Sequence, residues 1–463
     1  MPAPDIQQKI DAVCACLMTK VVEKDDPHIC QRLQDRMAAS HVPGVSIAVI
    51  HDGAIEWAQG FGVAEVGGRA VTAETLFQAG SISKPVAAMA ALRLVEQGRL
   101  ALDADVNHAL TSWKLPANTA APGAVTLRQL LSHTAGLTVH GFPGYAAGAA
   151  LPSLVQILNG EPPANTAPVR IEAPPGSRWK YSGGGYTIAQ LLLEGISRQS
   201  FPQLMQDTVL GPIGMRSSTY EQPLPVALRS GAATPYRANG TPIPGGFHTY
   251  PEMAAAGLWS TPTDLARYVI EVQRSLRGDA NHVLSAEMTR EMLTPGLGRH
   301  ALGLPIGGSP DDPFFSHSGI DAGFEAILVG YQQRGEGAIV MTNAQGGQLL
   351  AGEILRSIAH VYGWPDLHPI VRSSIAVDPA LLATYAGVYQ LTPTFAVTIT
   401  LEGGKLMSQA TGQGKIELFA EAPSRFFVKP VDAPLEFFTA SSGQITHLVL
   451  HQNGQDMRGE RKP

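Results

Sequence analysis

Ser81 and Lys84 place a hydroxyl and an amine three residues apart in this chain of 463 residues. Pro85 follows directly, and proline is tolerated only in the first turn of a helix, so the pattern predicts that an apolar helix begins near Ser81 and ends at Gly98. Residues i and i+3 share one face of a helix, which lets the amine reach the hydroxyl. A neutral lysine there could accept the serine proton, while N–H groups at the helix start face the reaction centre. The pair is typical of a covalent serine hydrolase.

The same spacing also occurs where a serine caps a helix and the lysine is only a solvated charge, so two further segments decide between these interpretations. Residues 175–186 contain a Pro-Gly turn, then Tyr181 and the start of a second apolar helix. Residues 314–324 form a short predicted strand with His317 and Gly319, where a substrate backbone could approach closely. The order and spacing of these segments favour the catalytic interpretation.

The three motifs resemble those of the serine β-lactamase and penicillin-binding-protein superfamily. The nearest branch contains class C β-lactamases, family VIII carboxylesterases and D-aminopeptidases, whose motifs are Ser-x-x-Lys, Tyr-x-Asn or Tyr-Ser-x, and Lys-Thr-Gly or His-x-Gly. The resemblance covers about residues 30 to 365 and does not specify a substrate. Further segments that agree with it are 42–49, 126–137, 211–215 and 257–266.

The resemblance implies a role for each motif residue. Ser81 would be the nucleophile that carries the acyl group, and Tyr181 the general base tuned by Lys84. The amine and the phenol would share a proton, and the sequence leaves open which of them holds it. His317 would replace the lysine of the third motif, orienting substrate or stabilising the transition state, with a titration near about pH 6.5. The oxyanion hole would be the backbone N–H groups of Ser81 and Ile320.

Two departures from the family pattern bear on the substrate. Gly183 stands where the second motif commonly has asparagine, whose carboxamide contacts the acylamide side chain of penicillins and peptides. Gly183, Ser318 and Gly319 are the residues we expect to line the substrate site. With His317 in place of lysine, the carboxylate clamp of the family becomes pH-dependent. Both departures predict weak β-lactamase activity at most, and favour esters or differently shaped amides.

Three function classes follow from these motifs. The first is a serine hydrolase without a cofactor that cleaves an ester or amide of a small molecule or short peptide, like a carboxylesterase or a D-aminopeptidase. The second is an acyl transferase or peptide cyclase that passes the same acyl group to an amine. The third is a penicillin-binding or ligand-binding module that acylates without turnover. His133 is a rival base for a Ser–His–Asp triad, although its segment favours a histidine that shapes a loop beside the site.

The pattern of elements predicts an α/β fold followed by a small β-domain. Residues 1–365 form the serine hydrolase domain, with an antiparallel sheet made by both chain ends, flanking helices and an all-helical subdomain between them. The site should lie in the crevice between sheet and helices. After a linker at residues 366–376, residues 377–463 resemble a lipocalin-like antiparallel β-barrel, whose interior we expect to be filled by side chains. The barrel would restrict the site or build a homo-oligomer.

Composition excludes several other classes of protein. The net charge is −6 and there is no basic stripe, which argues against a nucleic-acid partner. The sequence contains no run of 18 apolar residues, so a membrane-spanning helix is not expected. No signal segment is visible at the N-terminus, so a cytoplasmic protein is expected unless a leader has been removed. An odd number of cysteines argues against a disulfide framework and fits a reduced compartment. Their spacing with a nearby histidine matches no zinc pattern, so no metal is expected: Cys14, Cys16, His28 and Cys30.

Overall fold

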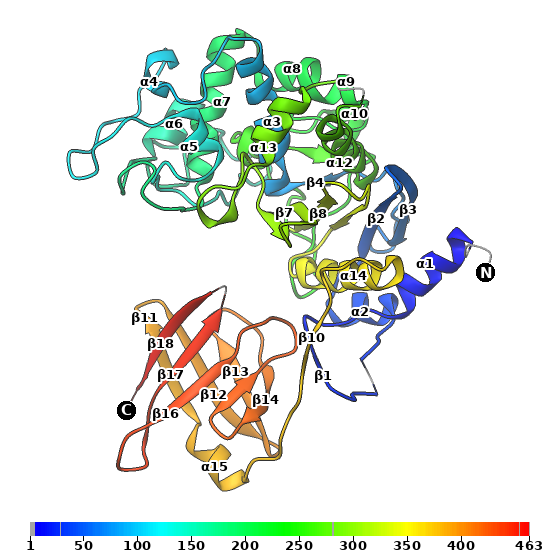
Figure 1. Cartoon of the computed structure of the whole chain (residues 1–463), viewed down its shortest axis with the longest axis vertical. Helices are drawn as coiled ribbons and strands as arrows, with labels where there is room; N and C mark the ends of the chain where they lie inside the picture. The colour runs from blue at the N-terminus through cyan, green and yellow to red at the C-terminus, as the bar shows by residue number, and fades with distance from the viewer. Residues whose placement is uncertain (1–4, 28, 280–281, 453, 463) are drawn as a thin grey trace. The chain divides into compact units, whose positions relative to one another are not determined.

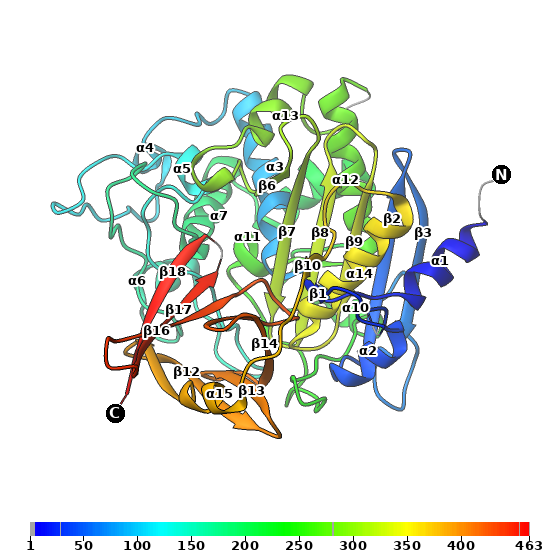
Figure 2. The same ribbon diagram turned by 60° about the horizontal axis from the view of Figure 1, so that its bottom comes forward.

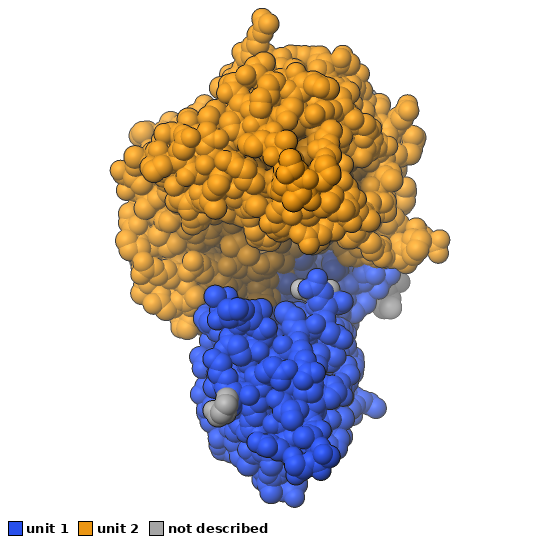
Figure 3. Space-filling model, turned by 90° about the vertical axis from the view of Figure 1, so that its left-hand side faces the viewer, with its two compact units in different colours: residues 1–33, 352–463 blue, residues 34–351 orange. Residues whose placement is uncertain are grey.

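The computed structural model describes residues 5–27, 29–279, 282–452 and 454–462. His28 and the first four residues, on which the metal and signal-segment predictions partly depend, lie outside the described residues. The chain divides into two compact units, coloured separately in Figure 3: residues 34–351, and residues 1–33 together with 352–463. Helix α14 (Gly347–Tyr362) carries the chain from the first unit into the second.

An antiparallel sheet with the strand order β3-β2-β9-β8-β7-β6 supports the unit of residues 34–351 (Figure 2). The first two strands of the chain in this sheet come from the beginning of the unit and the other four from its end, which confirms the predicted arrangement. Strands β2 and β9 are buried along almost their whole length because they are near-continuous apolar runs. The strands are β2 (Gly44–His51), β3 (Ala54–Gly62), β6 (Ile306–Gly308), β7 (Pro313–Asp321), β8 (Phe324–Tyr331) and β9 (Gly337–Thr342).

Helices fill the chain between β3 and β6, as predicted (Figure 1). Helix α3 is buried on almost every side because its sequence is nearly all small and apolar, which places it in the middle of the helical core. Helix α12 packs on the sheet. The helices of this region are α3 (Ser83–Glu96), α4 (Val106–Ala109), α5 (Leu127–Leu131), α6 (Leu154–Asn159), α7 (Gly183–Ser197), α8 (Phe201–Met205), α9 (Gly211–Ile213), α10 (Val226–Arg229), α11 (Met253–Ala256), α12 (Pro262–Arg277) and α13 (Ala286–Leu293), with a short pair of strands, β4 (Phe77–Gln78) and β5 (Trp259–Ser260). A further helix, α2 (Leu33–Ala39), precedes β2.

The N-terminal segment of the other unit contains a disulfide between Cys16 and Cys30, so the expectation of no disulfide is wrong. Leu17 and Gln31 exchange two backbone hydrogen bonds of 2.8 and 3.0 Å, which bring the neighbouring cysteines together. This pairing depends on a fold-back of the chain that the number of cysteines cannot reveal, and Cys14 is the one left over among the described residues. The segment contains α1 (Ile6–Ala15) and β1 (Val21–Glu23), which pairs in parallel with β10 (Ile370–Arg372).

Residues 387–461 form a closed antiparallel barrel of eight strands, as predicted for the C-terminal part. Closure leaves no free sheet edge. Apolar side chains fill the interior, among them Tyr389, Leu406, Phe426 and Leu448. The elements are α15 (Pro379–Thr384), β11 (Gly387–Thr392), β12 (Phe395–Glu402), β13 (Lys405–Ala410), β14 (Ile416–Ala422), β15 (Arg425–Phe427), β16 (Leu435–Thr439), β17 (Ile445–Gln452) and β18 (Gln455–Arg461). Across the described residues, every helix is too short or too polar to cross a membrane.

Candidate active site

Ser81 lies in a single 3-10 turn, Gly80–Ile82, between β4 and α3. The α-helix proper begins at Ser83, slightly later than the sequence pattern predicts. The Nζ atom of Lys84 is 2.9 Å from the Oγ atom of Ser81 and donates a second hydrogen bond of 2.8 Å to the carbonyl oxygen of Ala255. Lys84 is only 2% exposed. The amine is therefore buried and held against the hydroxyl by two hydrogen bonds.

Two glycines allow the turn that contains Ser81 to pack closely against the end of strand β7. Gly80 has a φ of +52°, and a Cβ atom built on it would lie 2.5 Å from the backbone nitrogen of Ile320. A Cβ atom on Gly319 would lie 1.9 Å from the carbonyl oxygen of Ala79. Only glycine fits at either position, because the space excludes a side chain at both and the positive φ disfavours one at Gly80. The contact places Ser81 and Ile320 close together, and both residues line the same pocket.

Tyr181 precedes helix α7 and faces the lysine. The Nζ atom of Lys84 lies 4.9 Å from the centroid of the Tyr181 ring. Ser182 fixes the start of α7, because its hydroxyl accepts a hydrogen bond of 3.1 Å from the backbone N–H of Gly185. The backbone N–H of Ser182 in turn donates to Nδ1 of His133 at 3.1 Å. The cap and the histidine together determine where the phenol points.

Histidine rings surround the Tyr181 ring. The ring centroids of His133, His140 and His317 lie 4.2, 4.8 and 6.3 Å from it. His133 is buried beneath the phenol and is absent from the pocket lining, which fits the predicted loop-shaping role better than a triad. Burial and then the positive charges and imidazoles around it hold the pKa of His133 well below its ordinary value. His140 was missed from the sequence, because it lies in a Gly/Pro-rich loop rather than in a motif.

His317 is neutral at physiological pH, which corrects the expected titration near about pH 6.5. Burial, followed by the charge of Lys84, lowers the pKa of His317 to about 3. Its Nδ1 atom is 2.6 Å from the carbonyl oxygen of Ser318, and a carbonyl can only accept, so this nitrogen carries the proton. The other ring nitrogen is therefore an acceptor. A neutral acceptor cannot clamp a carboxylate.

The pocket in front of Ser81 has a volume of about 420 Å³. Of the three residues expected to line the substrate site, Ser318 lines this pocket and Gly183 and Gly319 do not. Gly183 is buried under Phe142, whose ring would lie 2.9 Å from a Cβ atom added to the glycine. The backbone N–H of Gly183 donates a 2.9 Å hydrogen bond to the carbonyl oxygen of His140. The lining residues are Ser81, Lys84, His140, Gly141, Phe142, Trp179, Tyr181, Ala255, Ala256, His317, Ser318 and Ile320.

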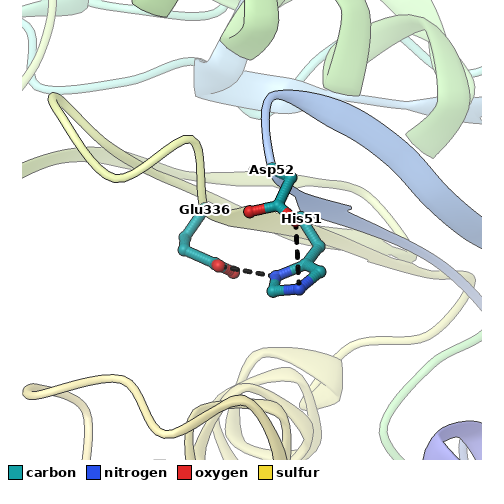
Figure 4. A group of neighbouring side chains, drawn as sticks. All are labelled: His51, Asp52 and Glu336. Carbon is teal, nitrogen blue, oxygen red and sulfur yellow. Dashed lines mark hydrogen bonds and ion pairs between the residues drawn. The ribbon is translucent and has the colours of Figure 1, made fainter. Parts of the chain in front are cut away.

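A separate group of side chains joins the β2–β3 hairpin to the segment before β9. His51, Asp52 and Glu336 offer three potential metal ligands within 4.8 Å of one another (Figure 4). The Nδ1 atom of His51 is 2.6 Å from Oε1 of the buried Glu336, and its Nε2 atom is 3.7 Å from Oδ2 of Asp52. A buried carboxylate needs such a partner. We interpret the group as an ion pair that stabilises the sheet.

The family model described as Beta-lactamase matches residues 29–362, and a domain of unknown function, DUF3471, matches residues 371–461. Penicillin-binding protein 4* of Bacillus subtilis (strain 168) is 23% identical over 468 residues, which are 93% of this chain and 98% of that protein. The octameric penicillin-binding protein homologue from Pyrococcus abyssi has a TM-score of 0.61 at 22% identity, with 92% of this chain and 98% of that chain covered. D-amino acid amidase from Ochrobactrum anthropi SV3 has a TM-score of 0.60 at 18% identity, with 78% and 99% covered. Because the family model spans well over half of the sequence, this chain belongs to the β-lactamase family of serine hydrolases.

Proposed function

We propose that the protein hydrolyses uncharged esters or amides through an acyl-enzyme on Ser81. The observation that carries the proposal is the 2.9 Å contact between the Ser81 hydroxyl and Lys84 at the base of the pocket. The Ser81 oxygen attacks the substrate carbonyl, and its proton passes to the Lys84–Tyr181 couple. The N–H groups of Ser81 and Ile320 stabilise the oxyanion. The leaving group departs with a proton from the couple, and water then releases the acyl group by the reverse sequence.

The charge of the pocket supports an uncharged substrate. Among the described residues that line the pocket, Lys84 is the one lysine, arginine, aspartate or glutamate, and it already donates to Ser81 and Ala255. A second cation, which would hold a carboxylate, is absent from this lining, as is an acid that would hold an ammonium group. His317 stays neutral because of its low pKa. Penicillins and cephalosporins, which carry a carboxylate near the reacting bond, and aminoacyl amides, which carry an ammonium group there, should therefore bind weakly.

An apolar rim supports a substrate with an aryl or branched acyl group. Trp179 is 41% exposed and Ile320 is 57% exposed, although both are large and apolar. Phe142 completes this rim. Exposed aromatic and aliphatic side chains around a polar centre are typical of a site that binds a hydrophobic group and orients it through a few polar contacts.

Covalent labelling and substrate profiling test the proposal. A fluorophosphonate should form one adduct on the wild type and on Ser177→Ala, a control at an exposed serine, and none on Ser81→Ala by intact-mass spectrometry. Short-chain p-nitrophenyl esters should then give a higher kcat/KM than D- or L-aminoacyl anilides or a chromogenic cephalosporin. An adduct that survives Ser81→Ala would refute the nucleophile. Acylation without turnover would instead indicate a penicillin-binding or transfer function.

A further inference from the structure

Two buried carboxyl groups lie behind the Ser81–Lys84 pair. Asp321 ends strand β7 and is 4% exposed, and Glu252 precedes helix α11 and is 0% exposed. Among the described residues, no group makes a well-aligned hydrogen bond to any of their four carboxylate oxygens, although the backbone N–H of Gly80 and the Tyr250 hydroxyl lie close enough to Asp321 to lower its pKa. Burying an ionised carboxylate without a partner is energetically costly, so burial favours the neutral, protonated form of such a group.

Each carboxyl group is attached to backbone that builds the active site. The backbone N–H groups of Ala255 and Ala256 donate to the carbonyl oxygen of Glu252, at 3.0 and 2.9 Å, and the carbonyl oxygen of Ala255 is the acceptor for Lys84. Asp321 directly follows Ile320, which lines the pocket. The charge of Lys84 interacts with Asp321, and Asp321 interacts with Glu252, so a change in the charge of the pair acts on the lysine.

The groups that face the two acids come from several elements. Burial raises the pKa of Asp321 well above its ordinary value, against the opposing effect of the Lys84 charge, and Glu252 raises it further. Burial raises the pKa of Glu252 to about 7. Two phenols, Tyr250 and Tyr145, also interact with this acidic pair, and the Tyr250 hydroxyl accepts a 2.9 Å hydrogen bond from the backbone N–H of Ala322. The pair thus faces one cation and two neutral phenols.

Apart from the two acids and Tyr181, the titratable groups that interact with the lysine do not change charge between about pH 7 and 10. Burial lowers the pKa of each imidazole and raises the pKa of the phenol in this set: His133, His140, His300, His317 and Tyr186. In this pH range, the two acids are therefore the groups whose change of charge can alter the protonation of the Lys84–Tyr181 couple.

We propose that Asp321 and Glu252 are positioning residues whose shared negative charge controls the proton affinity of the Lys84–Tyr181 couple. This inference rests on the proposed acyl-enzyme mechanism. When the pair loses a proton, the added charge stabilises the protonated couple, whichever of its two members holds the proton. The Lys84–Tyr181 couple then loses its proton, and can accept the proton of Ser81, only at a higher pH than it would beside a neutral pair of acids. The pair in this way sets the lower pH limit at which Ser81 is activated.

The test is the pH dependence of the rate at which a fluorophosphonate labels Ser81, between about pH 6 and 10. In the double variant Glu252→Gln, Asp321→Asn, the pH range in which the labelling rate rises (the rising limb of the pH–rate profile) should move to lower pH by at least about 0.5 pH unit. The reason is that a neutral pair no longer stabilises the protonated couple. KM for a neutral p-nitrophenyl ester should stay unchanged. Glu325→Gln is the matched control: this acid is also buried, but its oxygens accept from the backbone N–H groups of Gly346 and Gln348.

The outcomes separate the two proposals. A wild type that is not labelled on Ser81 refutes the proposed function. Labelling with a rising limb that stays in place, or moves to higher pH, overturns the role of the two acids while leaving the nucleophile intact. If circular dichroism shows that the double variant does not fold, each single variant should show part of the shift, and an unshifted limb in both overturns the inference.

Discussion

Replacing Glu252 by glutamine should change how the stability of the protein depends on pH. Burial raises the pKa of this carboxyl from 4.5 to about 7, so the folded protein keeps a proton that the unfolded chain releases above about pH 4.5. A group whose pKa is raised on folding favours the folded state below its unfolded pKa. That contribution is lost as the pH rises through the interval up to the folded pKa. Glutamine does not titrate, so the Glu252→Gln variant should not lose stability over this pH interval through residue 252.

The size of the effect follows from the two pKa values. One pKa unit corresponds to about 1.4 kcal/mol. The interval between 4.5 and about 7 therefore predicts that Glu252 removes about 3 kcal/mol from the free energy of unfolding as the pH rises across it. Relative to the wild type, Glu252→Gln should gain stability by about this amount between about pH 4.5 and 7.5.

Urea denaturation followed by tryptophan fluorescence at a series of pH values measures this difference. Glu221→Gln, at an exposed position, is the control and should leave the pH dependence of the wild type unchanged. Parallel curves for the wild type and Glu252→Gln would refute the reasoning, because they would mean that the folded protein does not hold the Glu252 carboxyl as the neutral acid.

Three further predictions concern the reaction and the disulfide. Tyr181→Phe should reduce kcat for esters by roughly 10²- to 10⁴-fold without unfolding the protein, and a loss below about fivefold would exclude this phenol as general base. The ratio of kcat/KM for a cephalosporin to that for a neutral ester should stay constant between about pH 5.5 and 8, because the pKa of His317 is about 3; a ratio that falls through about pH 6.5 would contradict a neutral imidazole. Cys16→Ser should destabilise its unit by about 3 kcal/mol, as expected for a loop of this length closed by a disulfide with Cys30, whereas Cys14→Ser should change the denaturation midpoint little.

The parts of the site that sequence predicts well are set by local periodicity. Ser81 and Lys84 face each other because they are three residues apart at a helix start, which is a property of the backbone alone. The sheet and the barrel were predictable for the same reason, since runs of apolar or alternating residues are the direct signature of strands. Sequence spacing therefore predicted the nucleophile and the layers that hold it.

The parts that sequence predicts poorly depend on contacts between distant segments. The charge of His317 follows from burial and from Lys84, and neither is visible in the third motif. Gly183 occupies the position of the family asparagine but lies under Phe142, which belongs to a loop without a motif. The Cys16–Cys30 disulfide needs the pairing of Leu17 with Gln31. These features require knowledge of which side chains meet in three dimensions.

The close contact between the Gly80 turn and the end of β7 has a consequence for the synthesis of this protein. Ser81 and Lys84 belong to the early part of the hydrolase unit, whereas Ile320 belongs to one of its last strands. A nascent chain that ends before this strand contains Ser81 and Lys84 but lacks one of the two N–H groups that we propose for the oxyanion hole. On the proposed mechanism, hydrolytic activity can therefore appear only after β7 has been synthesised, and a chain truncated before this strand should be inactive.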